Sequence, residues 1–453
     1  MSSATIVIPD DLARSFAGEF LRPPDATYDD VRRVHNGLID KRPAVIARAT
    51  STDDVAVALA LARRLGLELS VRGGGHNVAG RAVTDGGVMV DLSTMKRIDV
   101  DSQRRTVTAE GGVTWAEMDQ ATHEHGLVVP GGVVSSTGIG GLTLGGGLGW
   151  TQGRFGLSID NLLAAEVVTA DGTVIVASDE DHADLFWALR GGGGNFGVVT
   201  RFTYRAHPLT TVLGGLVAYP ADEAAQVLAT YRDVTASAPD ELSVQVGLLH
   251  TPDDAHAPII AVPLCHCGDD EAAAEADIEP LRHAGTVLAD DIGRIPYPAM
   301  NAATDPLFPR GTLNYWKQAF VDEVSGGLID VLIDAFATCP SPMSALVIEP
   351  LHGAAARVPI DATAFPYRRE GYAVLLCGQW QDPADNEANI SWVRDTFVAL
   401  APLVSDRRYV NYMGDGDSAR AAYGPQYDRL VDVKRRYDPD NLFRLNQNVD
   451  PTR

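Results

Sequence analysis

The first 210 residues of the chain contain several short apolar runs and one strongly amphipathic stretch. Residues 43–49 ("PAVIARA") and 67–73 ("LELSVRG") predict buried strands, and the second strand ends in a glycine turn. Residues 52–66 ("TDDVAVALALARRLG") predict a helix with one apolar face. Residues 162–178 predict a hairpin that turns at Asp171-Gly172. These segments indicate a succession of short α+β units.

The pattern changes near residue 210, where longer helices alternate with strands. Helices are predicted at 221–236 and 326–339, and strands at 241–250, 344–351 and 372–380. This order is typical of an α+β domain whose helices cover one face of an antiparallel sheet. Residues 405–453 return to a segment rich in Gly, Asn and Tyr.

Glycine is concentrated in three clusters of the first half, at residues 73–75, 138–149 and 191–197. Between residues 131 and 149, nine of nineteen residues are glycine, a density that predicts a loop lying against a ligand or another backbone. The N–H groups of such loops bind phosphate oxygens without a side chain in the way. Three clusters at one site indicate a large, flat, phosphorylated cofactor.

The segment "GGGGNFG" contains the spacing G-x-G-x-x-G at Gly192, Gly194 and Gly197. A dinucleotide fingerprint requires a strand before these glycines and a helix after them. Here residues 184–190 predict a helix before, and residues 198–206 predict a strand after. The order is reversed, so a Rossmann site is not favoured.

Length, charge and cysteine content narrow the class of protein. A chain of 453 residues favours two domains, and a net charge of −23 argues against nucleic acid or anionic lipid as a partner. Without an apolar run near 18 residues or a basic leader, we expect no membrane partner and a cytoplasmic location. The four cysteines suggest a reducing compartment, and "CHC" at 265–267 predicts buried strand cysteines, so no metal is expected.

Four co-linear motifs resemble the berberine-bridge-enzyme-like FAD oxidases, which belong to the vanillyl-alcohol-oxidase type of flavoprotein. The motifs are "VRGGGHNVAG", "GGLTLGGGLGWTQGRFGLSIDNLLAAEVVTADG", "DLFWALRGGGGNFGVVTRF", and "YVNY" with "YDPDNLFRLNQN". The resemblance implies an α+β fold: a PCMH-type FAD-binding domain of two α/β subdomains plus the C-terminal tail, with an inserted α+β substrate domain carrying an antiparallel sheet. The expected boundaries are 1–210 for the FAD-binding domain, 211–404 for the substrate domain and 405–453 for the returning C-terminal segment.

The resemblance also implies how FAD is held. His76 is expected to bond covalently to the 8α-methyl group of the flavin. The second attachment of many family members, a cysteine bonded to flavin C6, falls at Val134, so we expect a single covalent link. Thr137 falls beside flavin C4a, where a small side chain leaves room for O₂. The other expected cofactor-binding residues are Arg72, Gly73, Gly74, Gly75, Asn77, Gly80, Gly132, Gly138, Gly140, Gly141, Leu142, Gly146, Gly197, Val199, Asn411, Asn446 and Asn448.

Acid–base candidates lie in the tail and in the middle domain. On a strand, the spacing of Tyr409 and Tyr412 would place the two side chains on opposite faces. The resemblance favours Tyr412 as the base, although a phenol with a pKa near 10 needs a lowered pKa or a proton-accepting partner. Glu349 and Tyr372, on strands expected to face the flavin, are the possible partners. Leu375 stands where some family members have a carboxylate or glutamine.

These observations predict an FAD-dependent oxidase that takes hydride from a C–H bond of a small organic substrate and passes the electrons to O₂, giving H₂O₂. The substrate class stays open between an alcohol, a sugar and a secondary metabolite such as an alkaloid-like amine. Two alternatives also stay open: a flavin dehydrogenase that reacts poorly with O₂, and a flavoprotein that sequesters a drug-like molecule without net oxidation. The oligomeric state cannot be inferred from the chain.

Overall fold

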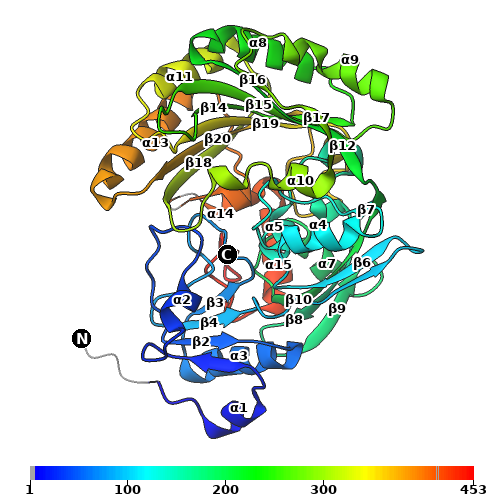
Figure 1. Cartoon of the computed structure of the whole chain (residues 1–453). Helices are drawn as coiled ribbons and strands as arrows, with labels where there is room; N and C mark the ends of the chain where they lie inside the picture. The colour runs from blue at the N-terminus through cyan, green and yellow to red at the C-terminus, as the bar shows by residue number, and fades with distance from the viewer. Residues whose placement is uncertain (1–5, 415, 417) are drawn as a thin grey trace.

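Three main sheets organise the residues that the computed structural model describes, which are 6–414, 416 and 418–453. Two smaller sheets form the lower part of the molecule and one large sheet forms the upper part (Figure 1). The first sheet has the order β1-β2-β4-β3 and contains β1 (Glu19–Leu21), β2 (Val45–Arg48), β3 (Leu69–Arg72) and β4 (Val88–Asp91).

Helix α3 (Thr52–Leu65) connects β2 to β3, and both of these strands pair with β4 in parallel. Its side chains Val55, Ala58, Leu59 and Ala62 are buried, which is the spacing of one helix face. Ser51 caps the N-terminus of the helix, because its hydroxyl accepts a hydrogen bond from the Asp54 N–H. The pattern of residues 43–73 therefore predicted this unit correctly.

The second sheet is antiparallel with the order β5-β6-β10-β8-β9. Its strands are β5 (Ile98–Asp101), β6 (Thr106–Glu110), β8 (Leu162–Val168), β9 (Val174–Ser178) and β10 (Val198–Arg205). The predicted hairpin is β8–β9, and its turn is closed by a hydrogen bond from the Thr169 N–H to the Thr173 carbonyl. Helix α7 (Ala183–Leu189) precedes the third glycine cluster and β10 follows it, so the order that argued against a Rossmann site is confirmed.

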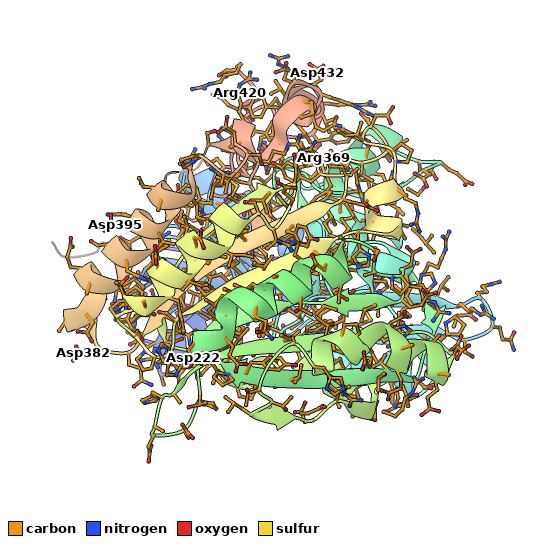
Figure 2. The ribbon with its side chains drawn as sticks, turned by 90° about the horizontal axis from the view of Figure 1, so that it is seen from above. Asp222, Arg369, Asp382, Asp395, Arg420 and Asp432 are labelled. Atoms are coloured by element: carbon orange, nitrogen blue, oxygen red, sulfur yellow. The ribbon has the colours of Figure 1, made fainter. Side chains whose placement is uncertain are left out.

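The third sheet is antiparallel and follows the order β16-β12-β15-β14-β19-β20-β18, with β13 and β17 paired at its margin. Helices lie on its upper face, as Figures 1 and 2 show, and they bury the side chains that point up from the strands. The strands are β12 (Thr211–Pro220), β13 (Leu242–Val244), β14 (Val246–His250), β15 (Pro258–His266), β16 (Ala289–Asp290), β17 (Gly293–Pro296), β18 (Leu313–Val321), β19 (Ala345–Leu351) and β20 (Gly371–Trp380). The helices are α8 (Ala224–Thr235), α9 (Glu271–Arg282), α11 (Gly326–Ala337) and α13 (Asn386–Leu400).

The remaining helices and strands are shorter. The C-terminal helix α15 returns to the lower part and packs beside α7 (Figure 1). The shorter elements are α1 (Asp10–Ser15), α2 (Tyr28–Arg32), α4 (Trp115–His123), α5 (Ile139–Gly145), α6 (Gln152–Phe155), α10 (Tyr297–Ala302), α12 (Ala354–Arg357), α14 (Ala419–Tyr423), α15 (Tyr427–Tyr437), β7 (Leu127–Val128) and β11 (His207–Pro208).

The glycine-rich segment contains helix α5, so the expectation of a continuous loop at 131–149 is wrong. Ile139 and Leu144 on this helix are buried in the core of the lower part, between the second sheet and α7. Most helix stability in proteins comes from packing, and here it overrides the low helix propensity of glycine.

The outer surface carries the acidic character of the chain. Figure 2 shows charged side chains, among them Asp222, Asp382 and Asp395, at the edge of the upper part, away from the sheet. Among the described residues, no helix has the length and apolar composition needed to cross a membrane.

Candidate active site

A large cavity of about 1280 Å³ separates the glycine loops below from the lower face of the third sheet above. All three glycine clusters contribute to its lower wall, and strands β19 and β20 contribute to its upper wall. Its volume exceeds the usual range for a small-ligand pocket, roughly 300–1,000 Å³, so there is room for a cofactor and a substrate together.

His76 lies in the wall of this cavity, at the end of the first glycine cluster. Its Nε2 atom is 2.9 Å from the Ser136 hydroxyl, and its ring stacks on the ring of His35 with the centroids 3.8 Å apart. Removal from water lowers the pKa of His76 to about 3, and the neighbouring His35 adds to this effect. The imidazole is therefore neutral at physiological pH.

The first two glycine clusters meet at Gly74 and Gly138. A Cβ atom on either residue would lie 2.3 Å from the backbone nitrogen of the other, so each loop requires glycine because of the other loop. Gly141 is different, because a Cβ built on it has no protein atom within 4 Å and it faces the cavity. The protein itself does not need a glycine there, whereas a flat ligand lying on α5 would.

Most of the expected cofactor-binding residues line the cavity. They are Gly73, Gly74, Gly75, His76, Asn77, Gly132, Thr137, Gly138, Gly140, Gly141, Leu142, Gly197, Val199, Asn411 and Asn446. Val134, at the position of the second covalent link in other family members, lines it too.

Four of the expected cofactor-binding residues do not line the cavity. The Arg72 guanidinium is held by the Asp91 carboxylate, with Nε 3.0 Å from Oδ1, so it supports the first glycine loop from behind. Gly80 packs against Ile39. Gly146 packs against Phe365 and Tyr409, and Asn448 is half-buried with its side-chain oxygen removed from solvent.

The C-terminal segment closes the lower wall of the cavity. The Asn446 side-chain amide donates to the Gly194 carbonyl at 3.1 Å. Behind it, the fully buried Lys434 ammonium bonds the Asp438 carboxylate at 2.6 Å and the Asn195 carbonyl at 2.7 Å. This buried pair fixes the tail to the third glycine cluster, a link that the sequence did not reveal.

The "YVNY" segment is a 3₁₀ turn over Val410–Tyr412, so the expectation of a strand is wrong. Residues three apart on a 3₁₀ turn lie on the same side. Accordingly, the rings of Tyr409 and Tyr412 touch edge to face, with their centroids 4.9 Å apart.

The Tyr409 side chain is hydrogen-bonded to the second glycine cluster. Its hydroxyl oxygen accepts hydrogen bonds from the Gly147 N–H at 2.9 Å and from the Asn411 side-chain amide at 2.8 Å. The same amide also donates to the Leu142 carbonyl at 2.9 Å. Burial raises the pKa of Tyr409 to about 12, so this phenol stays protonated and positions the loop.

Glu349 is a buried carboxyl group of the upper wall. Its side chain is buried and points from β19 into the cavity, where the Tyr412 hydroxyl donates to it at 3.2 Å. The Gln245 amide donates to the same carboxyl group at 3.1 Å. Burial raises the pKa of Glu349 to about 7, although the hydrogen bond from Tyr412 works against this rise. The pKa of Tyr412 is raised well above 10, mainly by burial and by the charge of Glu349.

Tyr372 lies on the other face of the third sheet, so the expectation that it faces the flavin is wrong. Its hydroxyl is 2.9 Å from the Thr235 hydroxyl of α8, under the helices. On β20 it shares a face with Val374 and Leu376, whereas Leu375 points into the cavity. The sequence contains a signal for these opposite orientations, because side chains alternate along a strand and residues 372 and 375 differ in parity.

Three further residues were not singled out from the sequence. Ser136 contacts His76, Gln245 contacts Glu349, and Trp316 of β18 lines the cavity beside Tyr412. Gln245 has a sequence signal, since it lies in the predicted strand 241–250 and shares its parity with Gly247 and Leu249, which also line the cavity. Cys265 and Cys267 are buried, the first on β15 and the second just after it, as expected.

Comparison with known proteins agrees with this geometry. Residues 43–178 match the family model described as "FAD binding domain", and residues 408–450 match "Berberine and berberine like". The chain is 33% identical over 467 residues to (R)-6-hydroxynicotine oxidase of Paenarthrobacter nicotinovorans, covering 96% of this chain and 97% of that protein. It is 29% identical over 450 residues to an FAD-linked oxidoreductase of Dictyostelium discoideum, covering 98% and 97%.

Solved structures give the same result. The crystal structure of 6-hydroxy-D-nicotine oxidase from Arthrobacter nicotinovorans superimposes with a TM-score of 0.89 at 31% identity, covering 96% of this chain and 98% of that one. Chitooligosaccharide oxidase shares the fold, with a TM-score of 0.84 at 21% identity over 97% and 98%. The chain therefore belongs to the berberine-bridge-enzyme-like FAD-linked oxidoreductases with a PCMH-type FAD-binding domain, which act on small organic substrates.

Proposed function

We propose that the protein is an oxidase of small organic amines or alcohols that holds FAD through one covalent bond at His76. Bound FAD supplies the acceptor for the substrate hydride, and O₂ then takes the two electrons and two protons to give H₂O₂. The observation that carries the proposal is the buried Glu349–Tyr412 pair, which faces the same cavity as His76.

The residues around the cavity fit FAD. The open face at Gly141 leaves room for a flat ring, and the neutral imidazole of His76 has the protonation state that a nucleophilic nitrogen needs. The small side chain of Thr137 leaves space for O₂ at the expected position. We retain the division into residues 1–210 and 405–453 for FAD binding and 211–404 for the substrate.

Glu349 is assigned as the base, in place of Tyr412. A buried phenol with a pKa well above 10 keeps its proton, whereas a carboxyl group with a pKa of about 7 is half ionised near neutral pH. Glu349 accepts the N–H or O–H proton of the substrate, and Tyr412 and Gln245 orient the carboxylate by donating hydrogen bonds.

The upper wall around Glu349 favours an apolar substrate. Trp316, Val347 and Leu375 face the cavity and offer an apolar surface to a ring, and Gln245 and Gln379 supply polar groups beside it. An aromatic or alicyclic ring bearing an amine or hydroxyl group fits this wall. The relative at 33% identity bears the name (R)-6-hydroxynicotine oxidase, which supports the same substrate class.

The covalent link is tested by acid precipitation of the purified protein. A yellow pellet that becomes colourless in His76→Ala, with the colour moving to the supernatant, is expected. A yellow supernatant from the wild-type protein would contradict the covalent role of His76 and leave FAD binding intact.

Oxidase activity is tested with an oxygen electrode and a panel of ring-containing amines and alcohols that includes 6-hydroxynicotine. Oxygen uptake with stoichiometric H₂O₂ is the expected result. Substrate-reduced flavin that persists for minutes in air would identify a dehydrogenase instead. Tight binding of panel compounds without flavin reduction would favour the sequestering alternative.

A further inference from the structure

A second, much smaller cavity lies beside Glu349, which also lines the large cavity. Its volume is about 10 Å³, which is room for about one water molecule. Glu349 and Gln245 form one side of it, and Trp150, Gln152 and Ser243 form much of the rest. It lies where the loop after the second glycine cluster meets strands β13 and β19.

Three polar atoms of the residues around this small cavity have no hydrogen-bond partner among the described residues. They are the indole Nε1 of Trp150, the amide oxygen of Gln152 and the hydroxyl of Ser243. The three side chains are buried, with exposed fractions of 1%, 5% and 4%. A buried polar group without a partner costs free energy, and in native proteins an ordered water molecule commonly supplies the missing bond.

We propose that the small cavity is a binding site for one internal water molecule that hydrogen-bonds the carboxylate of Glu349. The donors and acceptors match the needs of one water: Trp150 and Ser243 donate to it, and it donates to Gln152 and Glu349. Each of the three unpartnered groups is then satisfied. The role of this water rests on the proposed function, because it keeps the assigned base ionised.

Among Glu349 and the titratable groups that face it, only Glu349 changes its charge near neutral pH. Tyr409 and Tyr412 approach from the 3₁₀ turn, Cys377 from β20 and Tyr231 from α8. Burial raises the pKa of all four, so none of them becomes charged at pH 7. A hydrogen bond from the internal water stabilises the charged carboxylate, and its loss will move the ionisation of Glu349 to higher pH.

The test is a pH titration of the holoenzyme by infrared difference spectroscopy, following the C=O stretch of the protonated carboxyl group. Glu349→Gln identifies the band. Ser243→Val fills the cavity with a methyl group, and Trp150→Phe removes the indole donor. Each is expected to raise the midpoint of the Glu349 band by roughly one pH unit. Thr396→Val is the control, because Thr396 is a buried hydroxyl on α13 that lines neither cavity.

Unchanged midpoints in Ser243→Val and Trp150→Phe would overturn the proposal, as would equal shifts in the control. If the valine variant does not fold, Ser243→Ala and a high-resolution crystal structure of the wild-type holoenzyme replace it, and a dry cavity in that structure would be equally decisive. The spectroscopic readout needs no turnover. Failure of the oxidase assignment therefore leaves the water site testable, and loss of the water site leaves the oxidase assignment standing.

Discussion

The lower and upper walls of the large cavity are built in different ways. The lower wall consists mainly of backbone and small residues from three glycine clusters, and its positions are fixed by close backbone contacts such as that between Gly74 and Gly138. The upper wall consists of side chains that alternate along β18, β19 and β20. In the proposed function, the backbone wall holds FAD and the side-chain wall faces the substrate.

The sharpest test of this contrast is removal of the Glu349 carboxyl group from the upper wall. Glu349→Gln is expected to slow substrate-driven flavin reduction by about 10²–10⁴-fold, because the substrate proton loses its acceptor. Anaerobic stopped-flow absorbance measures the rate. FAD content should stay at the wild-type value, and a loss of FAD in this variant would contradict the separation of the two walls.

The converse test adds a side chain to the lower wall of the cavity. Gly141→Val places side-chain atoms where the cavity is open, and overpacking of this kind typically costs about 1–3 kcal/mol. In a His76→Ala background, where FAD is free to exchange, we expect roughly 5–150-fold weaker FAD binding by fluorescence titration. Gly293→Val on β17 is the matched control, since it also opens into free space but lies outside the cavity.

The pH dependence of flavin reduction reports the ionisation of the upper wall. Because burial raises the pKa of Glu349 to about 7 and the carboxylate is the base, the rate should rise with pH, reach half its maximum near pH 7 and become constant above it. Below the midpoint it should fall about tenfold per pH unit. This acidic limb of the pH–rate profile should be absent from the Glu349→Gln variant. If it persists there, a residue other than Glu349 is the base.

The smallest effect is expected from Tyr372, which lies on the helix-covered face of the same sheet. Tyr372→Phe removes the hydrogen bond to Thr235 and should lower the free energy of unfolding by about 0.5–1.5 kcal/mol, measured by urea denaturation. Turnover should stay within about twofold of the wild-type rate. A rate loss comparable to that of Glu349→Gln would place Tyr372 in the reaction after all.

The sequence by itself determined the class of protein, the cofactor and most of the lower wall. Local patterns sufficed for α3 and for the β8–β9 hairpin, because apolar spacing and turn residues act over a few positions. The glycine clusters and "GGGHN" predicted loops that line one cavity, since the backbone freedom of glycine is a property of the residue itself.

Only the tertiary structure decided the partners that meet across the chain. Glu349 and Tyr412 are 63 residues apart, and Gln245 is 104 residues from Glu349, so no local pattern links them. Long-range packing also turned "YVNY" into a 3₁₀ turn and the glycine-rich segment into α5. Strand parity alone indicates that Tyr372 and Leu375 point to opposite faces of the sheet. Which of these faces the helices cover is decided only when α8, α11 and α13 pack on it.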